Sequence, residues 1–413
     1  MPNHTTRHWS TLKLLKFSVL TVILLLGLAE ACARIFFSIK FHGTHTSVYI
    51  QGSPIQAADP ATVYNNRPFY VDYQKGFQYN ECGMKSACGD YAMPQKQTGD
   101  LWVLLMGGSA MEGMGSNKDG KWFDITHIPD HPYTETIAAC LQRLLSARYP
   151  TRNVRVFNAA VSGFTLSQGF LKYKSLSSRY DFDWVISMDG VNECDTLASD
   201  SEEAQQAYNR AYWAGFPFQS APLKYIVPIT QHSALFNTLK QEWYYLRLKG
   251  RMTRNERAGF PDRRFWAAQT GGTALPLALG DPRVANSRRA FLREMHTWED
   301  RLRQDHKKYL FLVQPYLPFR DTALLTLEER ALRQYLLKTD YDPYKVTFFR
   351  EVYDSVAVLE RTDPHIQTMS GVDHWPGWTF VDYCHFTRDA NERIASELAR
   401  WIQSDGNIPI FTP

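Results

Sequence analysis

The sequence lacks the cysteine and histidine patterns that hold structural metals. It contains six cysteines but no Cys-x-x-Cys pair and no paired-histidine motif, so we predict neither a metal site nor a cofactor. An excess of one charge is also missing, because 46 Lys and Arg residues stand against 42 Asp and Glu residues. The net charge of +4 on 413 residues gives no sign of a nucleic-acid partner. Repeats and low-complexity tracts are absent too, and 44% apolar residues predict one large core, alone or with a smaller lobe.

Only the amino terminus carries an apolar run long enough to cross a membrane. Residues 17–29 are almost entirely apolar, and the apolar character resumes as far as residue 39. Glu30 and Arg34 interrupt it, but they stand four residues apart on one helix face, where they can pair. A helix over 17–39 would span roughly 30 Å or more, which is enough for the core of a bilayer. We therefore predict a membrane anchor in residues 1–40.

The residues on either side of this run indicate a compartment. Basic residues precede it (Arg7, Lys13 and Lys16), which favours an orientation with the bulk of the chain outside the cytoplasm. An alternative stays open, because the small residues of the segment Ala29–Ala33 are spaced as at a signal-peptide cleavage site. The main domain is then either anchored or secreted, and it is exported in both cases.

The rest of the chain falls into four parts. Residues 41–98 are polar and rich in Pro and Gly, without a clear period, and predict an irregular lead-in; within it, Cys82 and Cys88 could close a small disulfide. Residues 99–196 and 300–413 alternate between strand and helix patterns. Residues 197–299 lose that pattern and predict a helical, aromatic-rich insertion.

The alternating pattern predicts an α/β fold. The expected strands are 101–106, 154–158, 184–188, 309–314 and 365–369, and the expected helices include 137–145, 166–177, 287–306, 324–337, 346–359 and 389–403. Strands that alternate with helices form parallel sheets with helices on both faces. The prediction is a three-layer α/β/α domain with a mostly parallel five-stranded sheet.

Ser109 stands at the end of the first of these strands. The apolar run 101–105 is followed by Met106-Gly-Gly-Ser109, so the serine lies at the carboxyl end of a buried strand, where open α/β sheets carry their chemistry. By itself this triplet also fits an ordinary turn between a strand and a helix.

A second candidate, Asp382-Tyr-Cys-His385, stands just before the last helix. A carboxylate three residues ahead of a histidine can accept the Nδ1 proton and leave Nε2 free to take a proton from a hydroxyl. The alternative is capping, since Asp382, Thr387 or Asp389 could simply begin the helix. Taken with Ser109, the pair suits ester hydrolysis.

Four blocks in this order resemble the SGNH (GDSL-like) hydrolase superfamily. They are Gly-Gly-Ser109, Asn158-Ala-Ala-Val-Ser-Gly163, Gly190-Val-Asn192 and Asp382-Tyr-Cys-His385. The resemblance implies a flavodoxin-like fold, Ser109 as nucleophile, and His385 and Asp382 as its base and orienting acid. It also implies an oxyanion hole made by Ser109, Gly163 and Asn192. Two departures stand out: Gly108 replaces the aspartate common before the nucleophile, and the acidic Asp189 and Glu193 flank Asn192.

These features predict an extracytoplasmic serine esterase that hydrolyses or transfers a short acyl group such as acetyl. The substrate would be an acylated small molecule, glycan or lipid, and Trp375 and Trp378 could stack on a sugar ring, although loop packing is the more common role for such residues. A lipase and an inactive binding protein of the same fold are the alternatives. A lipase would need an apolar groove beside Ser109, and an inactive protein would hold Ser109 beyond reach of His385.

Overall fold

The computed structural model describes residues 11–40, 56–59, 62–68, 70–72, 75–115, 130–193, 233, 235, 282–339, 343–406 and 411. The chain divides into two compact units. Residues 1–53 and 217–259 form the first, and residues 54–216 and 260–413 form the second. Most of the predicted helical insertion lies outside the described residues.

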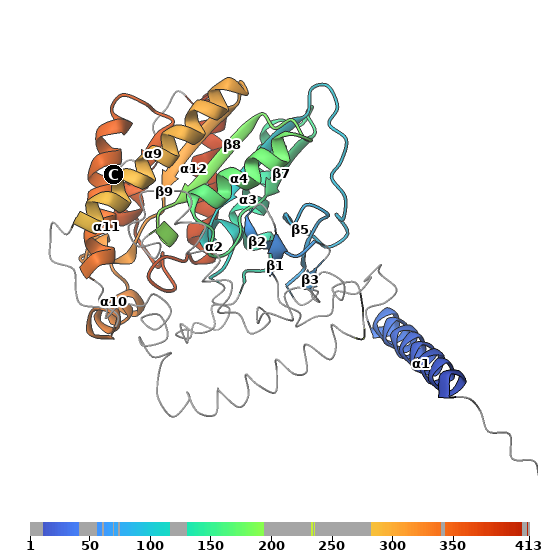
Figure 1. Ribbon diagram of the computed structural model, residues 1–413. Coiled ribbons are helices and arrows are strands. Elements are labelled where there is room, and N and C mark those ends of the chain that lie inside the picture. The colour runs from blue at the N-terminus through green and yellow to red at the C-terminus, as the bar shows by residue number, and fades with distance from the viewer. Residues whose placement is uncertain are drawn as a thin grey trace, which may run out of the picture. The chain divides into compact units, whose positions relative to one another are not determined.

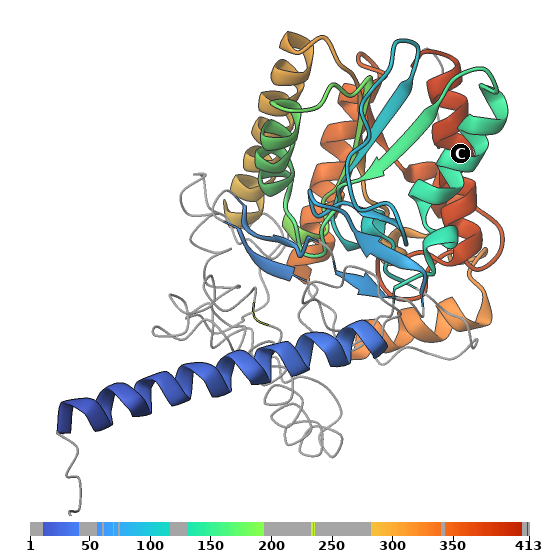
Figure 2. The same cartoon turned by 90° about the vertical axis from the view of Figure 1, so that its right-hand side faces the viewer.

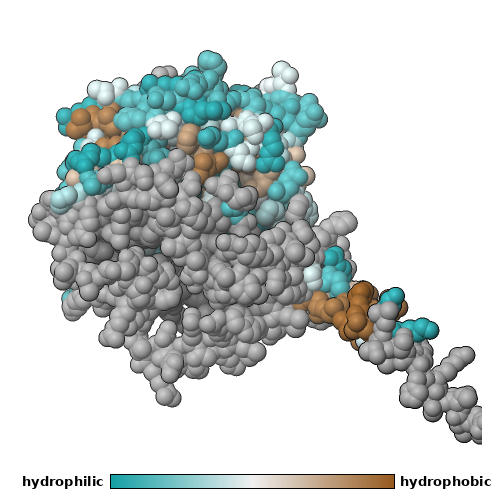
Figure 3. All heavy atoms as spheres, viewed as in Figure 1, coloured by the Kyte–Doolittle hydropathy of each residue, from teal (hydrophilic) through white to brown (hydrophobic). Residues whose placement is uncertain are grey.

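The described part of the first unit is mainly one helix, α1 (Thr11–Lys40). Its segment Leu15–Ile35 has a mean hydropathy of 2.0 and no buried residues, and its apolar side chains form the brown band in Figure 3. The predicted pair is present, because Arg34 Nε donates to Glu30 Oε1 at 2.7 Å. Ser233 Oγ donates to the other carboxylate oxygen of Glu30 at 2.8 Å. By length and composition α1 can cross a membrane, and a signal sequence has the same properties.

The second unit is built on a parallel sheet whose five strands are those expected from the sequence. They are β6 (Leu101–Gly107), β7 (Val154–Asn158), β8 (Trp184–Asp189), β9 (Lys308–Val313) and β10 (Ile366–Thr368). Their spatial order is β10-β9-β8-β6-β7, and every neighbouring pair is parallel. This is the 2-1-3-4-5 order of flavodoxin-like sheets. It makes β6, the strand before Ser109, the point where the order reverses.

The sheet is wider than predicted, and the lead-in is not irregular. Three short strands extend the sheet past β7 to eight strands, each antiparallel to its neighbour: β3 (Val71–Asp72), β4 (Phe77–Tyr79) and β5 (Lys85–Ala87). A separate antiparallel hairpin joins β1 (Gln56–Asp59) to β2 (Val63–Asn66). The prediction of five strands was wrong because strands of two to four residues carry no readable period.

Helices cover both faces of the sheet. The side chains of β6 alternate: Leu101, Val103 and Leu105 pack on one face, and Trp102, Leu104 and Met106 on the other. The first face contacts α3 (Ile137–Arg148) and α12 (Arg388–Gln403). The second contacts α4 (Leu166–Ser177), α9 (Pro282–Gln304) and α11 (Pro343–Glu360). Figure 1 labels these helices, and Figure 2 shows α4 and α9 on one side of the strands and α3 and α12 on the other. The three-layer arrangement was therefore predicted correctly.

The two lead-in cysteines do not form a disulfide. Cys82 and Cys88 are both free thiols. Cys82 is buried, and its sulfur lies 3.5 Å from the hydroxyl of Tyr180. Cys82 thus contacts the residues that follow α4 and does not bond Cys88.

Candidate active site

Ser109 begins the short helix α2 (Ser109–Glu112), directly after β6. A tight turn leads into it. Gly107 has a φ of 135°, and a Cβ there would lie 2.4 Å from the carbonyl oxygen of Met188 on the neighbouring strand. Only glycine fits such a conformation and such a contact. Because β6 lies between β7 and β8, the loops after all three strands meet around Ser109.

The loop of Asp382 and His385 is shaped mainly by its own bonds. Asp382 Oδ1 accepts the backbone N–H groups of Cys384 and His385, at 2.8 and 2.7 Å. This is the local turn that aspartate side chains favour. The backbone of Val381 donates to the carbonyl of His385 at 2.9 Å and closes the loop. Thr387, and not Asp382, caps the last helix, because its hydroxyl accepts the backbone N–H of Ala390. The Asp382 carboxylate is therefore available to bond His385.

Three predicted residues form a continuous hydrogen-bonded chain. His385 Nε2 lies 2.7 Å from Ser109 Oγ, and His385 Nδ1 lies 2.6 Å from Asp382 Oδ2. Asp382 is fully buried and His385 is only 4% exposed, while Ser109 is partly exposed. A hydroxyl that bonds Nε2 while a carboxylate holds Nδ1 has the geometry needed for proton transfer to the histidine.

Charge on these groups favours an ion pair. Burial by itself lowers the pKa of His385, but the Asp382 carboxylate and the Cys384 side chain together outweigh it, and the pKa stands well above 6.5. Burial raises the pKa of Asp382, but His385 and two backbone N–H groups outweigh it and bring the pKa below 3.8. The carboxylate is therefore charged at neutral pH and stabilises an imidazolium.

The loop also contains a third metal-ligating atom type. The thiol sulfur of Cys384 lies 3.6 Å from His385 Nδ1. Asp382, Cys384 and His385 are buried, and their ligand atoms lie within 4.8 Å of one another. The carboxylate of Asp382 already bonds the imidazole of His385, and the imidazole bonds Ser109. These residues therefore fit proton transfer better than metal binding.

The two predicted oxyanion residues lie in the loops beside Ser109. Gly163 follows β7 with a φ of 80°, a left-handed conformation that favours glycine. Asn192 follows β8, and its side-chain amide donates to the carbonyl of Phe164 at 2.7 Å. A Cβ on Gly108 would lie 2.5 Å from Asn192 Nδ2. The amide thus lies against the residue just before Ser109, and this contact leaves no room for a side chain at position 108.

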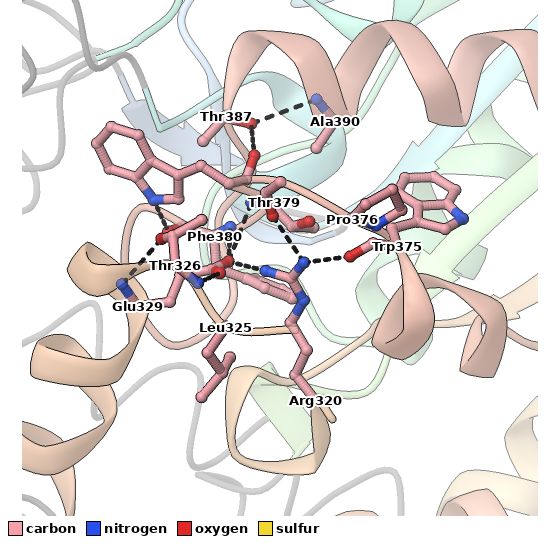
Figure 4. Close-up of polar contacts among 12 residues, drawn as sticks. Arg320, Leu325, Thr326, Glu329, Trp375, Pro376, Thr379, Phe380, Thr387 and Ala390 are labelled. Atoms are coloured by element: carbon pink, nitrogen blue, oxygen red, sulfur yellow. Dashed lines mark hydrogen bonds and ion pairs between the residues drawn. The ribbon is translucent and has the colours of Figure 1, made fainter. Parts of the chain in front are cut away.

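A buried ion pair supports the segment that leads to Asp382. Arg320 and Glu329 are 2% and 0% exposed and bond each other. Glu329 Oε1 also accepts the backbone N–H groups of Thr379 and Phe380, at 2.9 and 3.0 Å. Arg320 donates to the carbonyl of Trp375 (Figure 4). Glu329 stands at the start of α10 (Leu327–Thr339), so this helix holds the approach to the loop of Asp382 and His385.

The two predicted sugar-stacking residues are engaged within the protein. Trp375 is 9% exposed, and the guanidinium of Arg393 lies 4.2 Å from its ring centroid. Trp378 is partly exposed, and its Nε1 donates to the carbonyl of Phe380 at 2.6 Å. Since the ring of Trp375 is covered, the packing explanation accounts for it, and it does not offer a sugar-binding face.

Sequence reasoning missed two buried carboxylates that brace the loops of Gly163 and Asn192. Glu112 Oε2 accepts the backbone N–H of Ser162 at 2.6 Å. Glu193 accepts the N–H groups of Leu166 and Gly190, at 2.5 and 2.8 Å. Glu193 was noticed only as a flanking charge, and its place beside Asn192 was the available signal.

Burial changes the charge of the carboxyl groups near Asn192. Desolvation, with the nearby Asp189 carboxyl, raises the pKa of Glu193 to about 8. Desolvation likewise raises the pKa of Asp189 to about 7. Near neutral pH this pair therefore holds at least part of a proton, which limits the negative charge beside the oxyanion site.

No family model and no curated protein matches this chain. Among solved structures it is similar to a lipase/acylhydrolase from Enterococcus faecalis, with a TM-score of 0.35 and 13% identity over 74% of this chain and 96% of that one. It is also similar to an aryl esterase from M. smegmatis (TM-score 0.31, 16% identity, 74% and 99% of the chains). A third is an acetyl xylan esterase from Geobacillus stearothermophilus (TM-score 0.29, 13% identity, 76% and 97%). These neighbours are esterases and lipases, and at such scores their activities do not transfer to this chain.

Proposed function

We propose that this protein is a serine esterase of the SGNH type that hydrolyses esters of short acyl groups. The observation that carries the proposal is the chain of two hydrogen bonds from Ser109 Oγ through His385 to Asp382. A binding protein of the same fold would not need both hydrogen bonds, one from His385 to Ser109 at 2.7 Å and one from His385 to Asp382 at 2.6 Å. Hydrolysis is preferred to transfer, since no feature of the described residues favours an acceptor other than water.

The proposed reaction has two halves, the acylation and the deacylation of Ser109, and His385 transfers a proton in both. Ser109 Oγ attacks the acyl carbon while its proton passes to His385 Nε2, and Asp382 stabilises the imidazolium. The oxyanion accepts hydrogen bonds from the N–H groups of Ser109 and Gly163 and from Asn192 Nδ2. The intermediate collapses, His385 protonates the leaving alcohol, and an acyl-serine remains. Water, deprotonated by His385, then releases the acid and restores Ser109.

Labelling with a fluorophosphonate probe tests the proposal. The probe phosphonylates only an activated serine, so we expect stoichiometric labelling that disappears in Ser109→Ala and in His385→Ala. The matched control is His374→Ala, because His374 is an exposed histidine on the same stretch of chain and takes no part in the proposed reaction. Labelling that survives His385→Ala, or none in the wild type, would refute the esterase.

The chain length of the acyl group is a finer part of the proposal. A series of p-nitrophenyl esters from two to twelve acyl carbons separates the candidates. A kcat/KM that is highest at two to four carbons supports the short-acyl esterase, acting on an acetylated glycan or small molecule. A maximum at long chains would favour the lipase alternative, with α1 bringing the enzyme to its substrate.

We also propose, from the basic residues before the apolar run, that α1 is a membrane anchor and that the α/β unit lies outside the cytoplasm. The four-part division of the chain predicted above is retained with it. Fractionation of cells with and without a protease that cannot cross the membrane tests the orientation. Release of the full domain by salt, without detergent, would indicate a cleaved signal peptide instead.

A further inference from the structure

The two peptide units on either side of Ser162 are each held by a side chain from another part of the sequence. Gly163 N–H is one of the proposed oxyanion donors, and the carbonyl of Ser162 belongs to the same peptide unit. Gln56 Nε2 donates to that carbonyl at 2.7 Å. Glu112 Oε2 accepts the preceding N–H, that of Ser162, at 2.6 Å. The backbone carbonyl and the backbone N–H of Ser162 are therefore both bonded by side chains from other parts of the sequence.

Fixing the carbonyl also fixes the amide. A trans peptide is planar, and its C=O and N–H point in opposite directions. The described residues contain no cis peptide. A donor on the Ser162 carbonyl therefore determines where Gly163 N–H points. It also polarises the peptide, and hydrogen bonds in such a chain strengthen one another.

Gln56 is well supported for this role. It is the first residue of β1, opposite Asn66 in the hairpin register. Asn66 Nδ2 donates to the carbonyl of Ala160 at 3.0 Å, so two paired residues of the hairpin bond the same loop two residues apart. The far end is tied to α4, because Gln168 Nε2 donates to the carbonyl of Thr62 at 2.8 Å. The hairpin lies along the oxyanion loop as a brace.

We propose that Gln56 is a positioning residue of the oxyanion hole. Its amide orients the Ser162–Gly163 peptide and makes Gly163 N–H a stronger donor to the developing oxyanion. The inference rests on the proposed function and adds to it a residue of the lead-in, outside the four blocks that resemble the family. Glu112 completes the support from the side of the nucleophile.

Gln56→Met tests the role, since Met keeps the length of the side chain and removes the donor. Losing a whole oxyanion donor costs about 100- to 1,000-fold in kcat, so weakening one should cost about 10-fold. We expect that loss in kcat on p-nitrophenyl acetate, with KM changed less than about threefold. The affinity for a boronic acid that mimics the tetrahedral intermediate should fall by the same factor as kcat/KM. Gln56→Lys, which restores an N–H donor, should recover most of the rate.

The matched control is Gln142→Leu. Gln142 also donates its amide to a backbone carbonyl, that of Val154, and accepts from Val156, but it braces α3 to β7. It should lower the unfolding temperature and leave kcat and boronic acid affinity unchanged. A Gln56→Met enzyme with wild-type kcat, or an equal loss in Gln56→Met and Gln56→Lys, overturns the positioning role alone. A wild type that neither hydrolyses the ester nor takes the fluorophosphonate label overturns the proposed function and this inference with it.

Discussion

The two loops that meet at Ser109 differ in what sets their shape. The turn in loop 380–386 is made by bonds within the loop, from Asp382 to the two residues that follow Tyr383 and from Val381 to His385, and Leu317 and Gln314 bond the loop from outside. The loop 158–163 depends on Glu112, Asn66 and Gln56, which stand 50, 94 and 106 residues away from their partners. A local pattern can predict the first loop. Long-range support can be found only once the chain is folded.

Removing the hydroxyl that joins the two loops should have the largest effect. In Ser109→Ala the nucleophile is lost while the fold is kept, so we expect turnover to fall by about 10⁴- to 10⁶-fold. The unfolding temperature should stay within error of the wild type. Ser175→Ala, at an exposed serine of α4, is the control and should keep full activity. Residual activity above a few per cent would mean that another group attacks the ester.

A substitution in the loop 380–386 should have the second largest effect on the rate. In Asp382→Asn the amide oxygen can still accept the two backbone N–H groups, so the loop should keep its shape. The histidine, however, loses the carboxylate that fixes its tautomer, which costs about 10⁴-fold in kcat in serine hydrolases of this kind. Steady-state kinetics and circular dichroism measure the two effects. A rate within tenfold of the wild type would make the carboxylate dispensable.

Removing the proposed oxyanion donor Asn192 should lower the rate less than the two changes above. Asn192→Ala takes away one proposed oxyanion donor and leaves the nucleophile and base in place, so kcat should fall by about 100- to 1,000-fold. KM should change little, because the interaction forms mainly in the transition state. If the full rate remained, Asn192 would have only a structural role through its bond to Phe164.

The rate should also depend on pH through His385. The histidine acts as a base only when it is neutral, and its pKa is raised well above 6.5. The rate is therefore lost as the pH falls through that pKa, by about tenfold for each further unit. A pH profile of kcat/KM should show a single midpoint above 6.5. A midpoint at or below this value would contradict the effect assigned to the Asp382 charge.

Removing the charge of Glu329, which supports the loop 380–386 from outside, should have the smallest effect on the rate. Glu329→Gln leaves Arg320 buried without its counter-charge, which costs about 3–5 kcal/mol of stability. The loop keeps its internal bonds, so kcat of the folded enzyme should stay within about tenfold. The control is Glu392→Gln, which breaks an exposed pair with Arg143 and should cost less than about 1 kcal/mol. A collapse of kcat in Glu329→Gln would show that the internal bonds of the loop do not keep its shape without Glu329.

The sequence predicted most of what depends on local pattern. The five parallel strands and the helices between them follow from apolar periodicity, and this order brings Ser109, Gly163 and Asn192 to one edge. The strands β3 to β5 were missed because they are too short to carry a period. Gln56 was missed because nothing near it in the sequence refers to Ser162. Both interpretations of Trp375 stayed open, because an aromatic residue before the Asp-His pair looks the same in the sequence whether it is covered or free.

Gly108 has a consequence for how this site can vary. The space that its side chain would occupy already holds the amide of Asn192. Any larger residue at 108 must displace that amide, so positions 108 and 192 should change together when the protein diverges. Engineering a larger residue such as aspartate into position 108 alone would displace the Asn192 amide, a hydrogen-bond donor for which the glycine makes room.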